Sequence, residues 1–519
     1  MNAAVLMLAA MGAAPTMPNP TMANPTMVDG FERQTPWTAA ASDGVASHIA
    51  SAPGATGKAM ALDYDFGAVA GYAYAQRALP IDWPENFEIS LKVRGSGGVN
   101  DLQVKFVDAS GRNVWWWRRA NFRPSAEWQT ITIRARDVEF AWGPTDDKAL
   151  TKTAAMELVV VRGRDGGAGR IDVDDLTLTP RPPLTAPGKP IASDPRAMDR
   201  RADTAWQGRG GQALQIDLGG HRTLGGLSID WTLGKGAPAY AIEASDDART
   251  WRTLYRAIDG DGGNDPIPLP DAEAAYLRIG LPRGAPRASL AEVTVEAASW
   301  AKDLNGFVAS LARTAPRGTF PRGFSEQPYW TLVGTDGGGQ SGLIGEDGEI
   351  EVAKGAFSIA PFVVADGVTF GWADVAATQS LRDGDLPMPE VTWRAPDWHL
   401  ETTLVADQTA PRLLARWRLV NDAAQTKRLR LVLTVRPFQV NPPAQFLSQQ
   451  GGVAKISAIA WRDGQLAVTS AAAIAGDAPV TRTLAPLVTP TAVATRGFDQ
   501  GALMNPATAT AKAGGATHV

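Results

Sequence analysis

Short runs in which apolar and polar residues alternate recur along this 519-residue chain, with turn residues between them. Examples are residues 87–93, 128–133, 214–218 and 429–436. Such alternation buries one face of a β-strand, and the 53 glycines and 37 prolines supply tight turns between strands. A chain of this length exceeds a single hydrophobic core and is expected to form roughly three domains. The pattern therefore predicts an all-β protein.

Composition excludes several classes of function. The net charge of -4, without a basic stripe, argues against nucleic-acid binding. The chain has no cysteine, which excludes disulfides, thiolate metal sites and a cysteine nucleophile. Its four histidines are too few and too scattered to predict a catalytic triad or a multi-histidine zinc site. Any catalysis would have to depend on carboxylates.

The N-terminus has the pattern of an export signal. Residues 1–14 are apolar and end in small residues, which is typical of a signal peptide, although a basic n-region is missing. The apolar run is too short to span a bilayer, and no run of about 18 apolar residues follows later. Residues 15–27 have the composition of a flexible tether. We therefore expect a periplasmic or secreted bacterial protein.

Three consecutive tryptophans, Trp115 to Trp117, follow a strand-like run over residues 101–107 and a short turn. Side chains on a strand alternate between its faces, so Trp115 and Trp117 share one face and Trp116 takes the other. Aromatic rings beside polar groups suit a sugar, and we predict a carbohydrate site on the face of the pair. Its predicted residues are Trp115, Trp117, Arg119, Gln103, Lys105 and Asp101.

The alternative is that the indoles are packing residues of a β-sandwich, since large aromatics dominate core energetics. If the face that carries Trp115 and Trp117 is the buried one, Trp116 becomes the exposed residue. The proposed site would then be reduced to a single indole. This alternative stays open at the level of the sequence.

The first segment, residues 28–180, begins with Phe31-Glu32, has a glycine turn at 57–60 and ends with Asp174-Asp175 before an apolar residue. In these features it resembles the jelly-roll carbohydrate-binding modules of bacterial polysaccharide-degrading enzymes. The resemblance implies a structural calcium ion that ties the first strand to the last, with Glu32 and Asp174 as ligands; calcium prefers such oxygen donors. Alternatively, the two carboxylates cap strand ends or face water.

A proline-rich linker, residues 181–190, separates this segment from the next. Residues 191–297 contain Asp-x-x-Trp at 203–206, Leu-x-Ile-Asp-Leu-Gly at 214–219 and Ser-Asp-Asp at 245–247 before Trp251. In this order the elements resemble the discoidin, or coagulation factor 5/8 type C, domain. The resemblance implies an eight-stranded jelly roll whose loops bind glycans, or membranes in animal proteins. No run of apolar loop residues argues for lipid here, and Trp206 and Trp251 are expected in the core.

The third segment, residues 298–485, contains Tyr-Trp-Thr-Leu-Val-Gly at 329–334, Gly-Leu-Ile-Gly-Glu-Asp-Gly at 342–348 and Arg-Pro-Phe-Gln-Val-Asn-Pro-Pro at 436–443. These motifs resemble the β-supersandwich that precedes an (α/α)6 barrel in bacterial glycoside hydrolases and phosphorylases. No repeated amphipathic helices follow, and residues 486–519 are poor in large apolar residues. We expect a disordered tail and a chain that lacks the catalytic barrel.

The sequence therefore predicts two jelly-roll β-sandwiches followed by a β-supersandwich, with glycan binding as the function. One alternative is a hydrolase or phosphorylase component that acts only with a separate catalytic barrel. Another is an adhesion or scaffold protein of the cell envelope. Adjacent carboxylates such as Asp174-Asp175 and Asp246-Asp247 diverge, whereas glycoside hydrolysis needs two carboxyls facing each other across a sugar. No catalytic residue is nominated.

Overall fold

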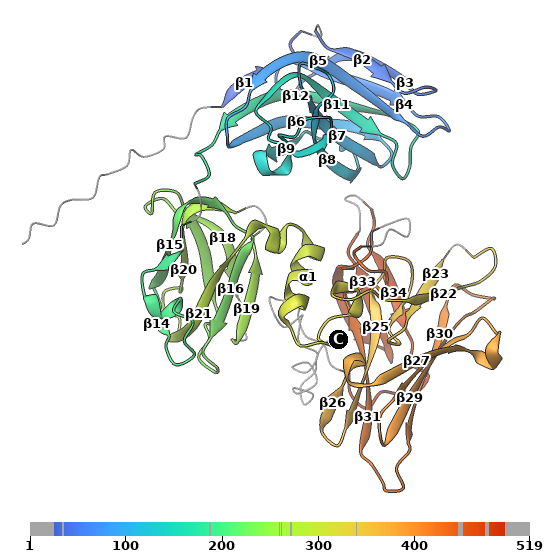
Figure 1. Cartoon of the computed structure of the whole chain (residues 1–519). Helices are drawn as coiled ribbons and strands as arrows, with labels where there is room; N and C mark the ends of the chain where they lie inside the picture. Colours follow the sequence, from blue (N-terminus) through green and yellow to red (C-terminus); the bar gives the residue numbers. More distant parts are fainter. Residues whose placement is uncertain are drawn as a thin grey trace, which may run out of the picture. The chain divides into compact units, whose positions relative to one another are not determined.

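The structure is a computed structural model, and it describes residues 25–33, 36–185, 188–258, 260, 262–269, 272–338, 340–444, 450–472 and 477–493. The predicted signal segment and most of the predicted tether and tail lie outside these residues. The chain divides into two compact units, Met1–Leu184 and Thr185–Val519. The described residues form many antiparallel sheets and little helix, so the all-β prediction is confirmed (Figure 1).

The first unit is a sandwich of two antiparallel sheets. In spatial order the first sheet consists of β3 (Ala46–Pro53), β4 (Lys58–Asp65), β12 (Ala168–Pro180), β6 (Phe87–Gly97) and β9 (Gln129–Arg134), with β1 (Thr26–Asp29) also paired to β12. The second sheet consists of β10 (Glu139–Trp142), β8 (Val114–Phe122), β7 (Asn100–Val107), β11 (Lys152–Val161), β5 (Tyr72–Asp82) and β2 (Thr38–Ala41).

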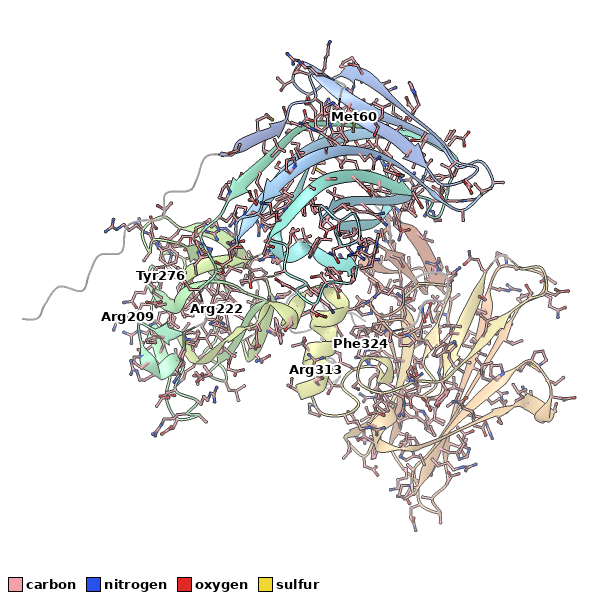
Figure 2. All side chains as sticks on the ribbon, turned by 45° about the horizontal axis from the view of Figure 1, so that its top comes forward. Met60, Arg209, Arg222, Tyr276, Arg313 and Phe324 are labelled. Atoms are coloured by element: carbon pink, nitrogen blue, oxygen red, sulfur yellow. The ribbon has the colours of Figure 1, made fainter. Side chains whose placement is uncertain are left out.

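Alternation along the strands builds the core between these sheets. In β6 the buried residues Phe87, Ile89, Leu91 and Val93 alternate with more exposed ones. They pack with inward side chains from both sheets, among them Met60 of β4, which is labelled in Figure 2. Because every second residue of a strand faces the same way, the opposite face of each sheet is left for solvent or a ligand.

The second unit begins with another antiparallel sandwich. One sheet consists of β13 (Ile191–Ala192), β15 (Ala213–Thr223), β20 (Glu273–Gly280), β17 (Tyr240–Ser245) and β18 (Arg252–Ala257). The other consists of β14 (Trp206–Gly208), β21 (Ala288–Glu296), β16 (Gly226–Trp231) and β19 (Asn264–Pro268). Leu214, Ile216 and Leu218 of β15 are fully buried, as their alternation predicts.

The Ser-Asp-Asp motif at residues 245–247 forms the turn after β17. The Asp247 carboxylate accepts hydrogen bonds from the backbone N–H groups of Arg249 (2.8 Å) and Thr250 (2.7 Å) and from the Ser245 hydroxyl (2.9 Å). These donors, led by the Thr250 N–H, lower the pKa of Asp247 to about 2. The motif therefore shapes a turn.

The described residues in the rest of the second unit form three further antiparallel sheets. One consists of β22 (Trp330–Gly334), β23 (Ser341–Gly345), β24 (Ile350–Glu351), β25 (Ser358–Ala365) and β26 (Val368–Phe370), with β31 (Leu429–Arg436) also paired to β25. The next consists of β27 (Ala376–Leu381), β28 (Pro389–Arg394), β29 (Trp398–Ala406) and β30 (Leu413–Asn421). The last consists of β32 (Ile456–Arg462), β33 (Gln465–Ser470) and β34 (Val480–Leu484).

A short helix, α1 (Leu304–Thr314), connects the sandwich to these sheets. Its N-cap residue is Asp303, whose side chain accepts a hydrogen bond from the Gly306 N–H at 2.7 Å. Its apolar side chains form a cluster with Trp300, Phe438 and Phe324, the last of which is labelled near α1 in Figure 2. In the part of the chain that the structure describes, no helix is long and apolar enough to cross a membrane.

Candidate functional site

Strand β8 decides which of the three tryptophans faces outward. Trp115 is 6 % exposed and lies in the core of the first sandwich. Its indole N–H donates to the Lys148 carbonyl oxygen at 2.7 Å, and its ring meets Phe140 edge-on at 5.5 Å. Trp117 is half-buried against the same core and lies opposite Val104 of β7. The predicted placement of this pair on an open face is wrong.

Arg119 is also separated from the predicted group. It pairs in register with Leu102, a core residue, and its guanidinium lies 5.6 Å from the ring of Phe122. The side chain itself is exposed because β8 is close to its end there. Arg119 therefore lies beside the edge of the core rather than among the outward residues.

Trp116 faces outward together with the predicted polar residues of β7. It lies directly opposite Lys105, while Arg118 lies opposite Gln103. The guanidinium of Arg118 lies 4.6 Å from the centre of the Trp116 ring. Trp142 of β10 meets Trp116 edge-to-face, with ring centres 5.5 Å apart and planes at 89°. These contacts build a surface of two indoles and two cations.

Two tyrosines of β5 extend this surface on the other side of β7. Tyr72 and Tyr74 have ring centres 5.9 Å apart. The Lys105 ammonium lies 5.7 Å from the Tyr72 ring and 5.3 Å from the Trp142 ring, so it lies between aromatic side chains from opposite halves of the sheet. We call the outward surface the aromatic face; it consists of Tyr72, Tyr74, Gln103, Lys105, Trp116, Arg118, Trp142 and Glu157.

Charge on the aromatic face is balanced at its centre. Lys105 Nζ lies 3.9 Å from Glu157 Oε2, and both side chains are mostly buried. Burial lowers the pKa of the Lys105 ammonium and raises the pKa of the Glu157 carboxyl, and each partner opposes the shift of the other. Asp101, the remaining predicted residue, accepts a hydrogen bond from the Asn121 N–H at 2.8 Å and so holds the end of β8.

Sequence reasoning missed three of the four outward rings. Tyr72 and Tyr74 are two positions apart, a spacing that puts both on one face of a strand. Trp142 is 47 % exposed, which is unusual for so large an apolar side chain. Neither pattern says which strands become neighbours, and this information comes only from the order of the strands in the sheet.

The predicted calcium ligands converge on the turn between β3 and β4. The buried Asp174 carboxylate accepts the Thr56 N–H at 3.0 Å and the Asp175 N–H at 2.7 Å, and Glu32 accepts the Lys58 N–H at 3.2 Å. Burial, and next the charge of Asp174, raise the pKa of Asp175. Among the described residues, no group of three or more histidine, cysteine, aspartate or glutamate side chains is arranged to hold a metal ion.

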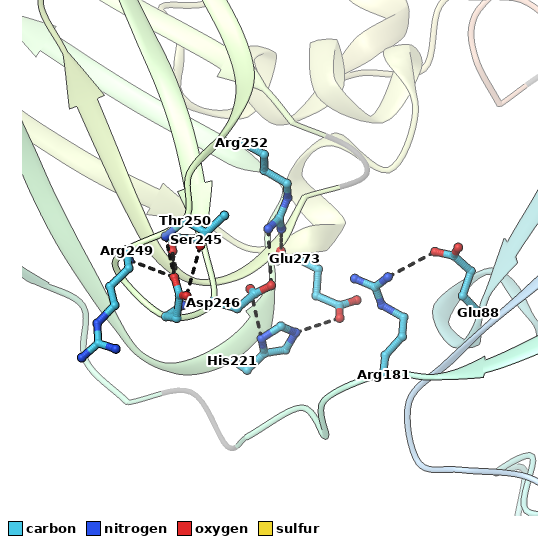
Figure 3. A network of polar contacts seen from close by, with 10 residues as sticks. Glu88, Arg181, His221, Ser245, Asp246, Arg249, Thr250, Arg252 and Glu273 are labelled. Atoms are coloured by element: carbon cyan, nitrogen blue, oxygen red, sulfur yellow. Dashed lines mark hydrogen bonds and ion pairs between the residues drawn. The ribbon is translucent and has the colours of Figure 1, made fainter. Parts of the chain in front are cut away.

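A polar network around the buried side chains of His221 and Glu273 lies in the second sandwich (Figure 3). His221 Nε2 lies 2.8 Å from Glu273 Oε1, and Nδ1 lies 3.4 Å from Asp246 Oδ1. Arg252 pairs with Asp246 at 3.4 Å. The network joins the end of β15 to the start of β20 and the turn after β17, and His221 is only 8 % exposed. The network fastens these strands together.

In the described part of the chain, the geometry defines two antiparallel β-sandwiches followed by further antiparallel sheets, and one sheet of the first sandwich carries the aromatic face. Residues 188–293 match the family model of the F5/8 type C domain. This agrees with the predicted resemblance of the second segment to discoidin domains. The comparison with curated proteins finds no match.

Solved structures similar to parts of the chain include carbohydrate-binding modules. The family 11 carbohydrate-binding module of the cellulosomal cellulase Lic26A-Cel5E of Clostridium thermocellum is 19 % identical, with 31 % of this chain and 97 % of that chain covered and a TM-score of 0.27. Chitosan-binding module 1 of a chitosanase/glucanase from Paenibacillus sp. IK-5 is 31 % identical, with 21 % and 92 % covered and a TM-score of 0.18. CpGH89CBM32-6 of Clostridium perfringens is 13 % identical, with 21 % and 92 % covered and a TM-score of 0.19.

Proposed function

We propose that the chain binds carbohydrate and that the aromatic face of the first sandwich is a binding site. The observation that carries the proposal is the outward group of Trp116, Trp142 and Tyr72 around Lys105. A pyranose presents C–H patches on its faces and hydroxyls around its edge. The rings supply flat apolar contact, and the lysine and glutamate side chains supply hydrogen-bonding partners.

The F5/8 type C match supports a second binding domain at residues 188–293. A chain with two such domains would hold a glycan at two points, which raises the effective affinity for a polymer over that for a short sugar. Residues 28–180 resemble carbohydrate-binding modules, and residues 298–485 resemble the β-supersandwich of glycoside hydrolases. Both resemblances further support the role of an accessory protein that binds polysaccharide for a degrading enzyme. The apolar N-terminal residues support export to the periplasm or the medium.

Calcium binding by Glu32 and Asp174 is part of the same proposal. It is supported by the convergence of both carboxylates on the backbone of residues 56–58. Calcium accepts carboxylate and backbone carbonyl oxygens together with water, so two carboxylates can suffice when carbonyls complete the set. The ion would offset the mutual repulsion of the carboxylates and tie the start of the domain to β12.

The binding proposal is tested with the full chain by affinity electrophoresis through gels that contain soluble polysaccharides. We expect retardation in at least one gel. Trp142→Ala and Trp116→Ala should each weaken this binding by about tenfold, because each removes one ring contact worth about 1.4 kcal/mol.

Trp128→Ala is the matched control, since Trp128 is a partly exposed indole of the same domain that lies beside Arg94 of the other sheet. It should leave binding unchanged. Absence of retardation in every gel, or equal loss in all three variants, would contradict the proposal.

A further inference from the structure

We propose that Lys105 and Glu157 make the aromatic face selective for neutral polysaccharides whose sugars carry adjacent free hydroxyls, and that the pair excludes polyuronates. The inference deepens the proposed function and rests on it. The rings of the aromatic face allow a sugar to stack, and Lys105 and Glu157 between them determine which sugars bind.

The position of the pair puts it in the path of any chain that spans the face. Lys105 and Glu157 are directly opposite each other on β7 and β11, the two central strands of the second sheet. The Lys105 ammonium lies 5.3 Å from the Trp142 ring of β10 on one side and 5.7 Å from the Tyr72 ring of β5 on the other. A ligand that touches both Trp142 and Tyr72 must therefore pass over the lysine between them.

The pair neutralises its own charge but keeps hydrogen-bonding capacity. At 3.9 Å, Nζ and Oε2 are too far apart for a hydrogen bond. Neither side chain forms a hydrogen bond with any other residue that the structure describes. The ammonium can donate and the carboxylate can accept, side by side. Adjacent hydroxyls match this arrangement, because one can accept from Lys105 while its neighbour donates to Glu157.

A carboxylate ligand would find no such match. Lys105 already has its counter-ion, and a second carboxylate would lie beside Glu157 in a mostly buried setting, where like charges repel strongly. The remaining charges around the pair are mixed, since Arg118 on β8 faces outward while Asp101 on β7 and Glu139 on β10 are negative. The face therefore lacks the excess positive charge that would attract a polyanion.

The test compares neutral and acidic polymers on variants of the full chain. Affinity gels contain soluble β-glucan or galactomannan as neutral probes, and polygalacturonate or alginate as acidic probes. The wild-type protein should bind a neutral probe at least tenfold more tightly than either acidic probe. Glu157→Gln keeps the shape but removes the negative charge, so it should weaken neutral binding about fivefold and raise polyuronate binding by a similar factor.

Lys105→Met retains the aliphatic stem and serves as the second variant. It should weaken neutral binding by about tenfold without gaining polyuronate binding, because it leaves Glu157 without its counter-ion. The matched control is Asp82→Asn, which removes an exposed carboxylate that pairs with Lys152 at 2.9 Å on the neighbouring strands β5 and β11. Thermal denaturation of each variant establishes that the domain remains folded.

The outcomes separate the two proposals. Preference of the wild type for a polyuronate, or an unchanged neutral-to-acidic ratio in both Glu157→Gln and Lys105→Met, would overturn the selectivity while Trp142-dependent binding stood. Failure to bind any probe would overturn the proposed function together with the selectivity. A shift of the ratio in Glu157→Gln but not in Asp82→Asn would support the inference.

Discussion

Adjacent tryptophans of β8 have opposite roles, and this predicts opposite effects of the same substitution. Trp115→Ala should lower the free energy of unfolding by about 3–5 kcal/mol, because it leaves a large cavity and an unpaired Lys148 carbonyl. Trp116→Ala should cost less than about 1.5 kcal/mol, since its ring lies outside the core. Urea denaturation of the full chain measures both values, and equal losses would contradict the assignment of faces.

At the scale of single residues, the sequence could predict the alternation but not its direction. The alternation of Leu102, Val104 and Phe106 with Gln103 and Lys105 was visible, and it marks the inner face of β7. The assignment of β8 depends on its register with β7. In the structure Val107 pairs with Val114, which places Trp116 opposite Lys105. A shift by one residue would have turned Trp115 and Trp117 outward, so the hairpin geometry carried the missing information.

At the scale of elements, two glycines in the turn between β3 and β4 leave the space that the carboxylates of Asp174 and Glu32 occupy. A Cβ atom at Gly54 would lie 2.5 Å from Asp174 Oδ2, and one at Gly57 would lie 1.9 Å from Glu32 Oε1. Gly57 also has a φ of +60°, which other residues rarely adopt. The glycine turn that marked the resemblance is thus needed for the close approach of both predicted calcium ligands.

Removal of the proposed calcium ion should destabilise the first unit at this turn. EDTA should lower the midpoint of thermal unfolding of the first unit, and excess calcium should restore it; calcium at 100 times its dissociation constant stabilises by about 2.7 kcal/mol. Glu32→Gln should weaken the calcium response, whereas Asp82→Asn, which lies in an exposed ion pair, should keep it. An unfolding midpoint that neither EDTA nor calcium changes would contradict the calcium proposal.

Elements far apart in the sequence also explain why most of the aromatic face could not be predicted. Tyr72, Lys105 and Trp142 come from β5, β7 and β10, and they meet because of the strand order β10-β8-β7-β11-β5. Local patterns predicted that these segments are strands and that the fold is all-β. They carry no signal for strand order, which depends on how the whole sandwich closes its core. The alternation of its strand predicts Lys105 as a site residue. Its neighbours Tyr72 and Trp142 can be found only once the strand order of the sheet is known.

At the scale of the whole molecule, the cores indicate which parts should unfold together. The apolar core of the first unit is confined to that unit. In the second unit, Trp300 lies against Gly226 of β16 and meets Phe307 of α1 edge-on at 4.9 Å. Phe307 belongs to the same cluster as Phe438, which follows β31. A continuous apolar path thus links the F5/8 type C-like sandwich to the later sheets.

We therefore expect two calorimetric transitions, one for each compact unit, rather than one for each of the three predicted domains. Trp300→Ala removes the residue that contacts both β16 and α1, so it should destabilise the second unit by about 2 kcal/mol and divide its transition. The first transition should keep its midpoint. Trp461→Ala is the matched control, because this indole of β32 in the same unit is 37 % exposed. Three transitions in the wild-type protein would show that the sandwich and the later sheets unfold independently despite the apolar path between them.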